Sequence, residues 1–272
     1  MCDIRQSKKG MKIRVKVYFK TILMNIKSQL EYRKAFIVST LGSFLITFFM
    51  ICAVYFLFMN FNQIGDWNFY EVGFLFGISY FNFSLAEMFL RGLDHFDDTI
   101  RNGEFDRLMI RPQNLLIQSI SMEFDLSKLG RLLQSALIIV IALCKINVDW
   151  TVYKTLTFIF INIGCFIIFF AIFILKATFC FWTINGLEFM NILSEGGKRV
   201  AQYPINIYEK WFRLFFTYIV PFGIVNYFPV MYLFGKSNNR YYGLTPLGTV
   251  LFLFICIYIW KIGVKHYEST GS

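Results

Sequence analysis

Apolar positions in this chain gather into runs of about 20 residues and do not alternate with polar ones. A helix needs about 20 mostly apolar residues to cross the hydrocarbon core of a bilayer. Inside that core only helices and closed barrels satisfy every backbone polar group, and barrel strands alternate over about ten residues. The pattern predicts an all-α polytopic membrane protein with six transmembrane helices, over residues 35–58, 69–90, 129–148, 156–181, 214–234 and 247–264.

The fifth of these spans differs from the others because it holds two prolines. Pro221 and Pro229 each remove a backbone donor and disfavour a continuous helix. Both lie toward the end of the span that we place near the outer leaflet. Broken backbone at membrane depth is tolerated only against protein or a water-lined cavity. We therefore expect a helix break at both prolines, with a short re-entrant segment before the last span.

Composition agrees with lipid as the solvent. Of 272 residues, 57% are hydrophobic and 16% are charged, whereas a soluble domain is about 45–50% apolar and about 25% charged. We expect no cleavable signal peptide, because the residues before the first apolar run are polar and basic. We expect a cytoplasmic N-terminal segment over residues 1–34 and a single six-span domain over residues 35–272.

The placement of positive charge predicts the orientation. With the spans as predicted, 22 Lys and Arg residues fall on the side of the N-terminus and 4 on the other. Because basic loops stay in the cytoplasm, both termini are expected to be cytoplasmic and the membrane to be the cell membrane. The third span is weakly apolar, but without it most of this asymmetry would vanish.

Two polar segments carry helical patterns. Ile22, Ile26 and Leu30 lie four residues apart within residues 12–34, with lysines on the other face; this is typical of an amphipathic helix lying in the membrane interface, and a plain polar tail is the alternative. The connection over about residues 91–130 is rich in charge and suits docking onto a soluble partner, the alternative being a solvated loop.

Catalytic chemistry is missing from the sequence. The nearest approach to a phosphate-binding loop, Gly235-Lys236-Ser237, lacks its earlier glycine and does not open a helix after a strand. Six scattered cysteines and two histidines make a metal site improbable. We therefore expect no enzymatic activity, no metal and no cofactor bound by this chain.

Three charged residues fall inside the predicted spans, where charge is costly and a functional role is the default hypothesis. They are Glu71, Glu87 and Lys176. Glu87 lies one turn before Arg91 and can pair with it, and Lys176 lies near a helix end and can extend toward the surface. A structural role is favoured for each over contact with a substrate or ion.

Four sequence stretches resemble a known family: GEFDRLMIRP at 103–112, DLSKLGRLL at 125–133, PFGIVNYFP at 221–229 and KHYESTGS at 265–272. Together they are similar to a branch of the ABC-2-like permeases of type II ABC exporters. The resemblance implies six helices per permease and an N-terminal connecting helix. It also implies a coupling helix seated on the ATPase, comprising Gly103, Glu104, Phe105, Asp106, Arg107, Arg111 and Pro112.

The resemblance further implies partners. Two permeases, identical or related, would join two separate ATPase subunits, which carry the ATP and Mg; lipid surrounds them, and no nucleic acid is implied. A non-transporting scaffold or sensor and an ion-driven secondary carrier remain alternatives. Binding of an ATPase would separate the transporter from the carrier, and ATP-dependent flux would separate it from the scaffold.

Overall fold

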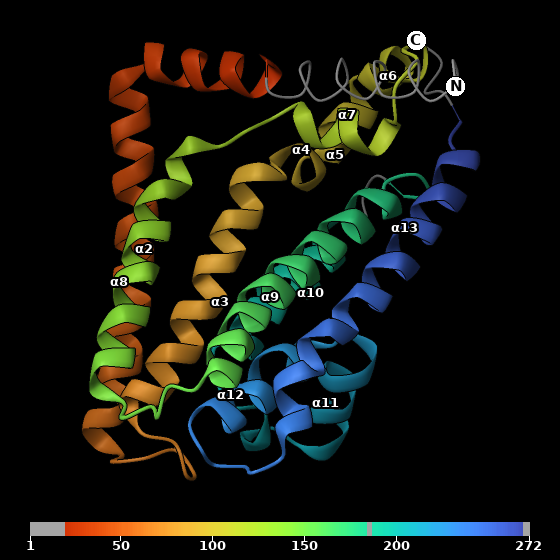
Figure 1. Cartoon of the computed structure of the whole chain (residues 1–272). Coiled ribbons are helices and arrows are strands. Elements are labelled where there is room, and N and C mark those ends of the chain that lie inside the picture. Colours follow the sequence, from red (N-terminus) through yellow and green to blue (C-terminus); the bar gives the residue numbers. More distant parts are fainter. Residues whose placement is uncertain (1–19, 184–186, 269–272) are drawn as a thin grey trace, which may run out of the picture.

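The computed structural model describes residues 20–183 and 187–268, and within them the chain is helical and contains no strand. Long helices run side by side between two ends of a bundle (Figure 1). We call the end that holds the N-terminal helix and residues 91–128 the polar end, and the other the opposite end. The long helices are α2 (Arg33–Asn60), α3 (Phe69–Phe89), α8 (Leu129–Lys145), α9 (Val152–Phe179) and α13 (Thr249–Lys265).

Shorter elements fill both ends of the bundle. At the polar end these are α4 (Arg91–Asp94), α5 (Phe96–Arg101), α6 (Glu104–Met109), α7 (Leu115–Ser121) and the 3₁₀ turn η1 (Leu126–Lys128). Next along the chain come α10 (Leu187–Ala201), η3 (Ile205–Ile207), α11 (Lys210–Leu214), the π-helices η4 (Phe215–Ile219) and η5 (Gly223–Tyr227), α12 (Phe228–Leu233) and η6 (Arg240–Gly248).

Among the residues that the structure describes, five helices are long and apolar enough to cross a membrane, and the pair Lys210–Ile219 and Gly223–Leu233 would make a sixth if it were one span. The prediction of an all-α polytopic membrane protein is therefore confirmed. Helix α3 is the most enclosed of them, because small residues let its neighbours approach closely. A Cβ on Gly77 would lie 2.7 Å from the Ile139 side chain on α8. Helix α2 instead exposes most of its apolar surface, as a lipid-facing span does.

The fifth predicted span, residues 214–234, is not a straight helix. Its two halves meet at 83° across a break that contains Pro221. Both lie at the opposite end (Figure 1), where the Trp67 ring contacts the rings of Tyr227 at 5.9 Å and Phe234 at 6.4 Å. At the break itself, the Phe222 ring lies 5.4 Å from that of Phe169, within α9. The segment is therefore a re-entrant hairpin that enters and leaves at the opposite end.

Because the hairpin does not cross, another segment must carry the chain between the ends, and this is α10 with η3. Phe181, just before α10, packs at the polar end against Tyr267. Beyond α10, the Asn206 side chain lies 4.0 Å from where a Cβ on Gly65 would stand, at the opposite end. The predicted spans leave the residues between 181 and 214 as a connection at the polar end; for the described part, from residue 187 onward, this is wrong. Hydropathy missed α10 because it holds Lys198, which is nevertheless buried.

Because this segment crosses the bundle, its four basic residues no longer count toward the polar end. The difference in basic residues between the two ends becomes smaller but keeps its direction. Lys198 and Arg199 belong to α10, and Lys210 and Arg213 lie on α11 at the opposite end. Of the basic residues that the structure describes, 12 then lie at the polar end and 6 at the opposite end. The asymmetry still favours a cytoplasmic polar end.

One buried amide joins the hairpin to three neighbouring segments. The Asn226 amide nitrogen donates to Ser79 Oγ on α3 and to the Ala201 carbonyl at the end of α10, both at 2.9 Å. Its oxygen accepts from Cys165 Sγ on α9 at 2.8 Å. All the bonding atoms of this amide are therefore satisfied within the bundle, as a buried polar group requires.

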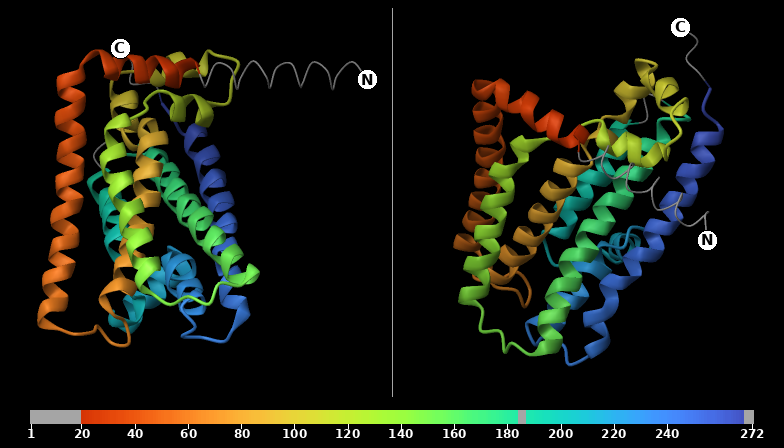
Figure 2. Two further views of the ribbon diagram at one scale, coloured as in Figure 1. Left: turned by 60° about the vertical axis from the view of Figure 1, so that its left-hand side comes forward. Right: turned by 45° about the horizontal axis from the view of Figure 1, so that its top comes forward.

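The N-terminal helix lies across the polar end, and the chain turns from it into α2 (Figures 1 and 2). Residues 20–31 are helical, and Ile22 packs with Met88 and Phe124. Asn25 donates to the Met122 carbonyl at 3.1 Å. Of the helix predicted over residues 12–34, residues 20–31 form this N-terminal helix, residues 33 and 34 already belong to α2, and residues 12–19 lie outside the described residues.

Candidate functional site

The predicted coupling segment folds into four short helices, α4 to α7, which form a platform on the polar end (Figure 2). Gly103 joins α5 to α6 with a φ of 66°, a left-handed conformation that favours glycine. Gly92 lets α4 approach α7 closely, since a Cβ there would lie 2.1 Å from the Ser119 carbonyl oxygen. Two glycines therefore set the shape of the platform.

Phe105 fastens the platform to the bundle. Its side chain is fully buried, and its ring lies 5.3 Å from that of Phe181 and 4.8 Å from that of Tyr267. A third neighbour is Phe96 on α5, at 5.4 Å. Phe105 is therefore not available to a partner, and its contribution to the predicted coupling helix is to hold α6 in place.

The other predicted coupling residues differ in exposure. Glu104, Arg107, Arg111 and Pro112 are exposed, whereas Asp106 is half-buried. Burial and the nearby carboxylate of Asp106 raise the pKa of the Tyr267 hydroxyl. A docking partner would thus meet three charged side chains and one proline of the set.

Sequence reasoning missed two apolar members of the same surface. Ile110 is 84% exposed and Met109 is 43% exposed, both at the end of α6. An exposed apolar pair within a charged stretch is a common mark of a docking surface. The pair stands in the sequence between Arg107 and Arg111, and the coupling residues were predicted mainly from the charged positions around it.

Beneath the platform, an ion-pair network joins α3, α4, η1, α8 and α9. Glu87 lies 3.7 Å from Arg91, as predicted from their spacing, but only 2.7 Å from Arg131 on α8. Lys128 lies 3.7 Å from Glu87 and 3.5 Å from Asp125. Glu87 on α3 therefore lies closer to its partner on α8 than to Arg91 at the start of α4.

Lys176 does not extend toward the surface. It is buried, and its ammonium pairs with Asp94 Oδ1 on α4 at 2.6 Å. Burial alone would raise the pKa of Asp94, but Lys176 and then Arg91 outweigh it and hold that pKa below its usual value. The pair joins α9 to the platform.

At the opposite end, Glu71 makes contacts with the start of its own helix and with a lysine. Its carboxylate accepts from the Asn68 backbone N–H at 2.8 Å and caps the start of α3. It also pairs with Lys236 at 2.7 Å. Pro229, predicted as a second helix break, lies instead in the first turn of α12, where a proline is tolerated; the 83° bend belongs to Pro221 alone.

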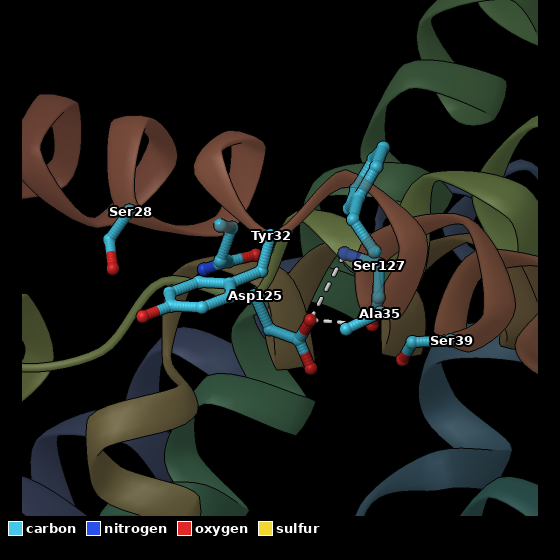
Figure 3. A pocket seen from close by; sticks show the side chains of 8 residues that line it. Ser28, Tyr32, Ala35, Ser39, Asp125 and Ser127 are labelled. Carbon is cyan, nitrogen blue, oxygen red and sulfur yellow. Dashed lines mark hydrogen bonds between the residues drawn. The ribbon is translucent and has the colours of Figure 1, made fainter.

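A cavity of about 390 Å³ lies where the N-terminal helix meets α2 and η1. Figure 3 shows Ser28, Tyr32 and Asp125 around it, with Asp125 accepting from the Ser127 hydroxyl at 2.6 Å. That hydroxyl and Lys128 keep the pKa of Asp125 below its usual value although burial opposes them. Gln29 on the cavity wall donates to the Phe124 carbonyl and accepts from the Leu126 N–H, so the helix is fastened to the chain that follows α7.

The fold and this site define a polytopic α-helical membrane protein with a charged platform at one end of its bundle. The model of the ABC-2 family transporter proteins matches residues 22–271, and the chain belongs to that family. No curated protein and no solved structure matched the chain. The chain is therefore a membrane component of an ABC transporter, a role in transport and not in catalysis, and its family implies partnership with an ABC ATPase component.

Proposed function

We propose that the chain is the permease subunit of an ATP-driven ABC exporter in the cell membrane, with both termini cytoplasmic. In this proposal a separate ATPase subunit, which binds ATP and Mg, docks on the platform at the polar end. Two permeases, identical or related, form the translocation path. The excess of basic residues at the polar end supports the orientation.

The observation that carries the proposal is the way the platform is fixed to the bundle. Helix α6 exposes Glu104 and Arg107 but is held from beneath by Phe105. Helix α4 is joined to α9 through the Asp94–Lys176 pair. A push on α6 would therefore move the ends of two spans and not merely bend a loop, and this is what coupling to an ATPase requires.

The test is a pull-down of the tagged chain from its native cells in mild detergent, with the co-purifying proteins identified. We expect an ATPase subunit in stoichiometric amount, and either one or two permease sequences. Finding no ATPase would refute the proposal and favour the scaffold or secondary-carrier class. ATP-dependent efflux from vesicles then tests the direction of transport.

Variants make the test specific to the platform. Reversing Glu104 and Asp106 to Lys is expected to detach the ATPase, but Asp106 is half-buried and influences Tyr267. Glu104→Lys with Arg107→Glu is the sharper pair, because both side chains are exposed. Asp149→Lys changes an exposed charge in the loop between α8 and α9 and is the matched control. If the platform variant retains the ATPase as well as the control does, the docking assignment is wrong.

A further inference from the structure

A groove of about 580 Å³ lies between α7 and the end of α13, at the polar end. Its walls are mainly apolar, with Leu115 and Leu116 on one side and Ile257 and Val264 on the other. None of its lining residues is acidic, and two of them, Lys261 and Lys265, are basic and exposed. The groove thus combines an apolar interior with a positive rim.

The groove continues a stripe of exposed apolar side chains along α13. Leu251, Phe254 and Tyr258 are 68%, 64% and 66% exposed, and they follow one another at helical spacing. Lys261 and Lys265 continue the same face by one and two further turns. Because α13 ends at Lys265, the lysines lie where a spanning helix leaves the hydrocarbon.

This arrangement fits a molecule that is apolar along its length and anionic at one end. Lysines near helix ends at a membrane surface attract anionic lipid headgroups, and a basic pocket beside a transmembrane helix is a known form of such a site. A zwitterionic lipid would fill the groove equally well but would gain little from the two ammonium groups. The charge of the rim therefore selects the headgroup.

We propose that this groove binds one anionic phospholipid, with an acyl chain along the α13 stripe and the phosphate between Lys261 and Lys265. The inference does not depend on transport or on an ATPase. It places the lipid beside the platform, because Gln118 on α7 donates to the carbonyl oxygens of Leu108 at 3.3 Å and Gln113 at 3.2 Å. The wall of the groove and α6 are thus one hydrogen-bonded unit.

The test is native mass spectrometry of the purified full-length chain. Phosphatidylglycerol and phosphatidylcholine with identical acyl chains are added in turn, and the bound fraction is measured against lipid concentration. We expect the chain to retain phosphatidylglycerol in preference to phosphatidylcholine. In Lys261→Gln with Lys265→Gln, phosphatidylglycerol should bind about 30-fold more weakly, as expected for two lysines near a lipid surface. Phosphatidylcholine binding should be unchanged.

Two further variants serve as controls. Lys261→Arg with Lys265→Arg keeps the charge and should retain the lipid. Lys145→Gln with Lys154→Gln removes two lysines from the opposite end, at the end of α8 and the start of α9, and should leave binding at the groove unchanged. Equal retention of the two lipids by the wild type would overturn the proposal. So would an equal loss in both glutamine variants, which would mean that net charge alone attracts the lipid.

Discussion

The pair between Asp94 and Lys176 gives the sharpest prediction, since it joins α9 to the platform. The two side chains are 13% and 7% exposed, and the charged atoms are 2.6 Å apart. Among the described residues, Lys176 has no second ion-pair partner. Asp94→Asn keeps the size of the side chain while removing the charge that compensates the buried ammonium. Arg91, which also pairs with Asp94, retains Glu87 and Asp125 as partners.

The expected cost follows from leaving a buried charge unpaired. Removing one member of a buried ion pair destabilises a protein by about 3–5 kcal/mol. Because the asparagine oxygen still accepts a hydrogen bond, we expect the lower end of that range, about 3 kcal/mol. Adding Lys176→Met removes the stranded ammonium. Since replacing both charges is often neutral, the double variant should lie within about 1 kcal/mol of the wild type.

The assay is unfolding by SDS titration of the purified protein in mixed micelles, followed by far-UV circular dichroism. The pKa of Asp94 lies below its ordinary value of 3.8. The stability from its ionised form is therefore present above pH 3.8 and is lost as the pH falls through the lower folded-state value. The gap between Asp94→Asn and the wild type should stay constant from pH 8 to pH 5 and narrow below about pH 4.

The reasoning would be refuted by either of two results. One is that Asp94→Asn unfolds at the wild-type SDS concentration, which would mean that solvent or lipid phosphate already screens Lys176. The other is that the double variant is as unstable as Asp94→Asn, which would assign the loss to packing.

Three further predictions concern the platform and the opposite end. Phe105→Ala should lower the free energy of unfolding by about 3–5 kcal/mol in the same titration and release the ATPase. Ile110→Ala should weaken ATPase retention without changing stability. Equal stability of the two variants would contradict the anchoring role of Phe105. The His95–Glu123 hydrogen bond raises the pKa of His95 above 6.5, so its stabilisation is full below pH 6.5 and lost as the pH rises through the folded-state value. SDS unfolding measured from pH 6 to pH 8 should show this loss of stability, which is at most about 1 kcal/mol for so exposed a pair. If the same loss is seen in His95→Gln, it does not come from His95. Glu71→Ala should cost about 2 kcal/mol, because it removes a helix cap and an ion pair; Glu71→Gln, which keeps the cap acceptor, should lose less, and equal losses would place the whole effect in the charge.

Hydropathy predicted the helices that face lipid or apolar neighbours, but it missed a helix whose polar residues are buried among other helices. The spans over α2, α3, α8, α9 and α13 are apolar because lipid or other apolar helices surround them. Helix α10 contains Ser194 and Lys198, which are buried in the bundle and have protein partners. No window of apolar residues marks such a helix, while the apolar hairpin over 214–234 satisfies the same test without crossing.

The candidate site was predictable as a segment but not residue by residue. Its charge and its likeness to a coupling helix identified residues 91–130. Burial of Phe105 depends on Phe181 and Tyr267, which are far away in the sequence, so no local pattern separates it from its exposed neighbours. The choice of Arg131 over Arg91 as the nearer partner of Glu87 likewise depends on how closely α8 packs against α3.

The three hydrogen bonds of Asn226 fix the hairpin to its neighbours at a single residue. A hydrogen bond weakens steeply once its atoms separate beyond about 3.5 Å. This one amide is bonded to α3, α9 and the end of α10 together. A movement that carries Asn226 out of its site must therefore break all three bonds, and they form again only when all four segments return to their places.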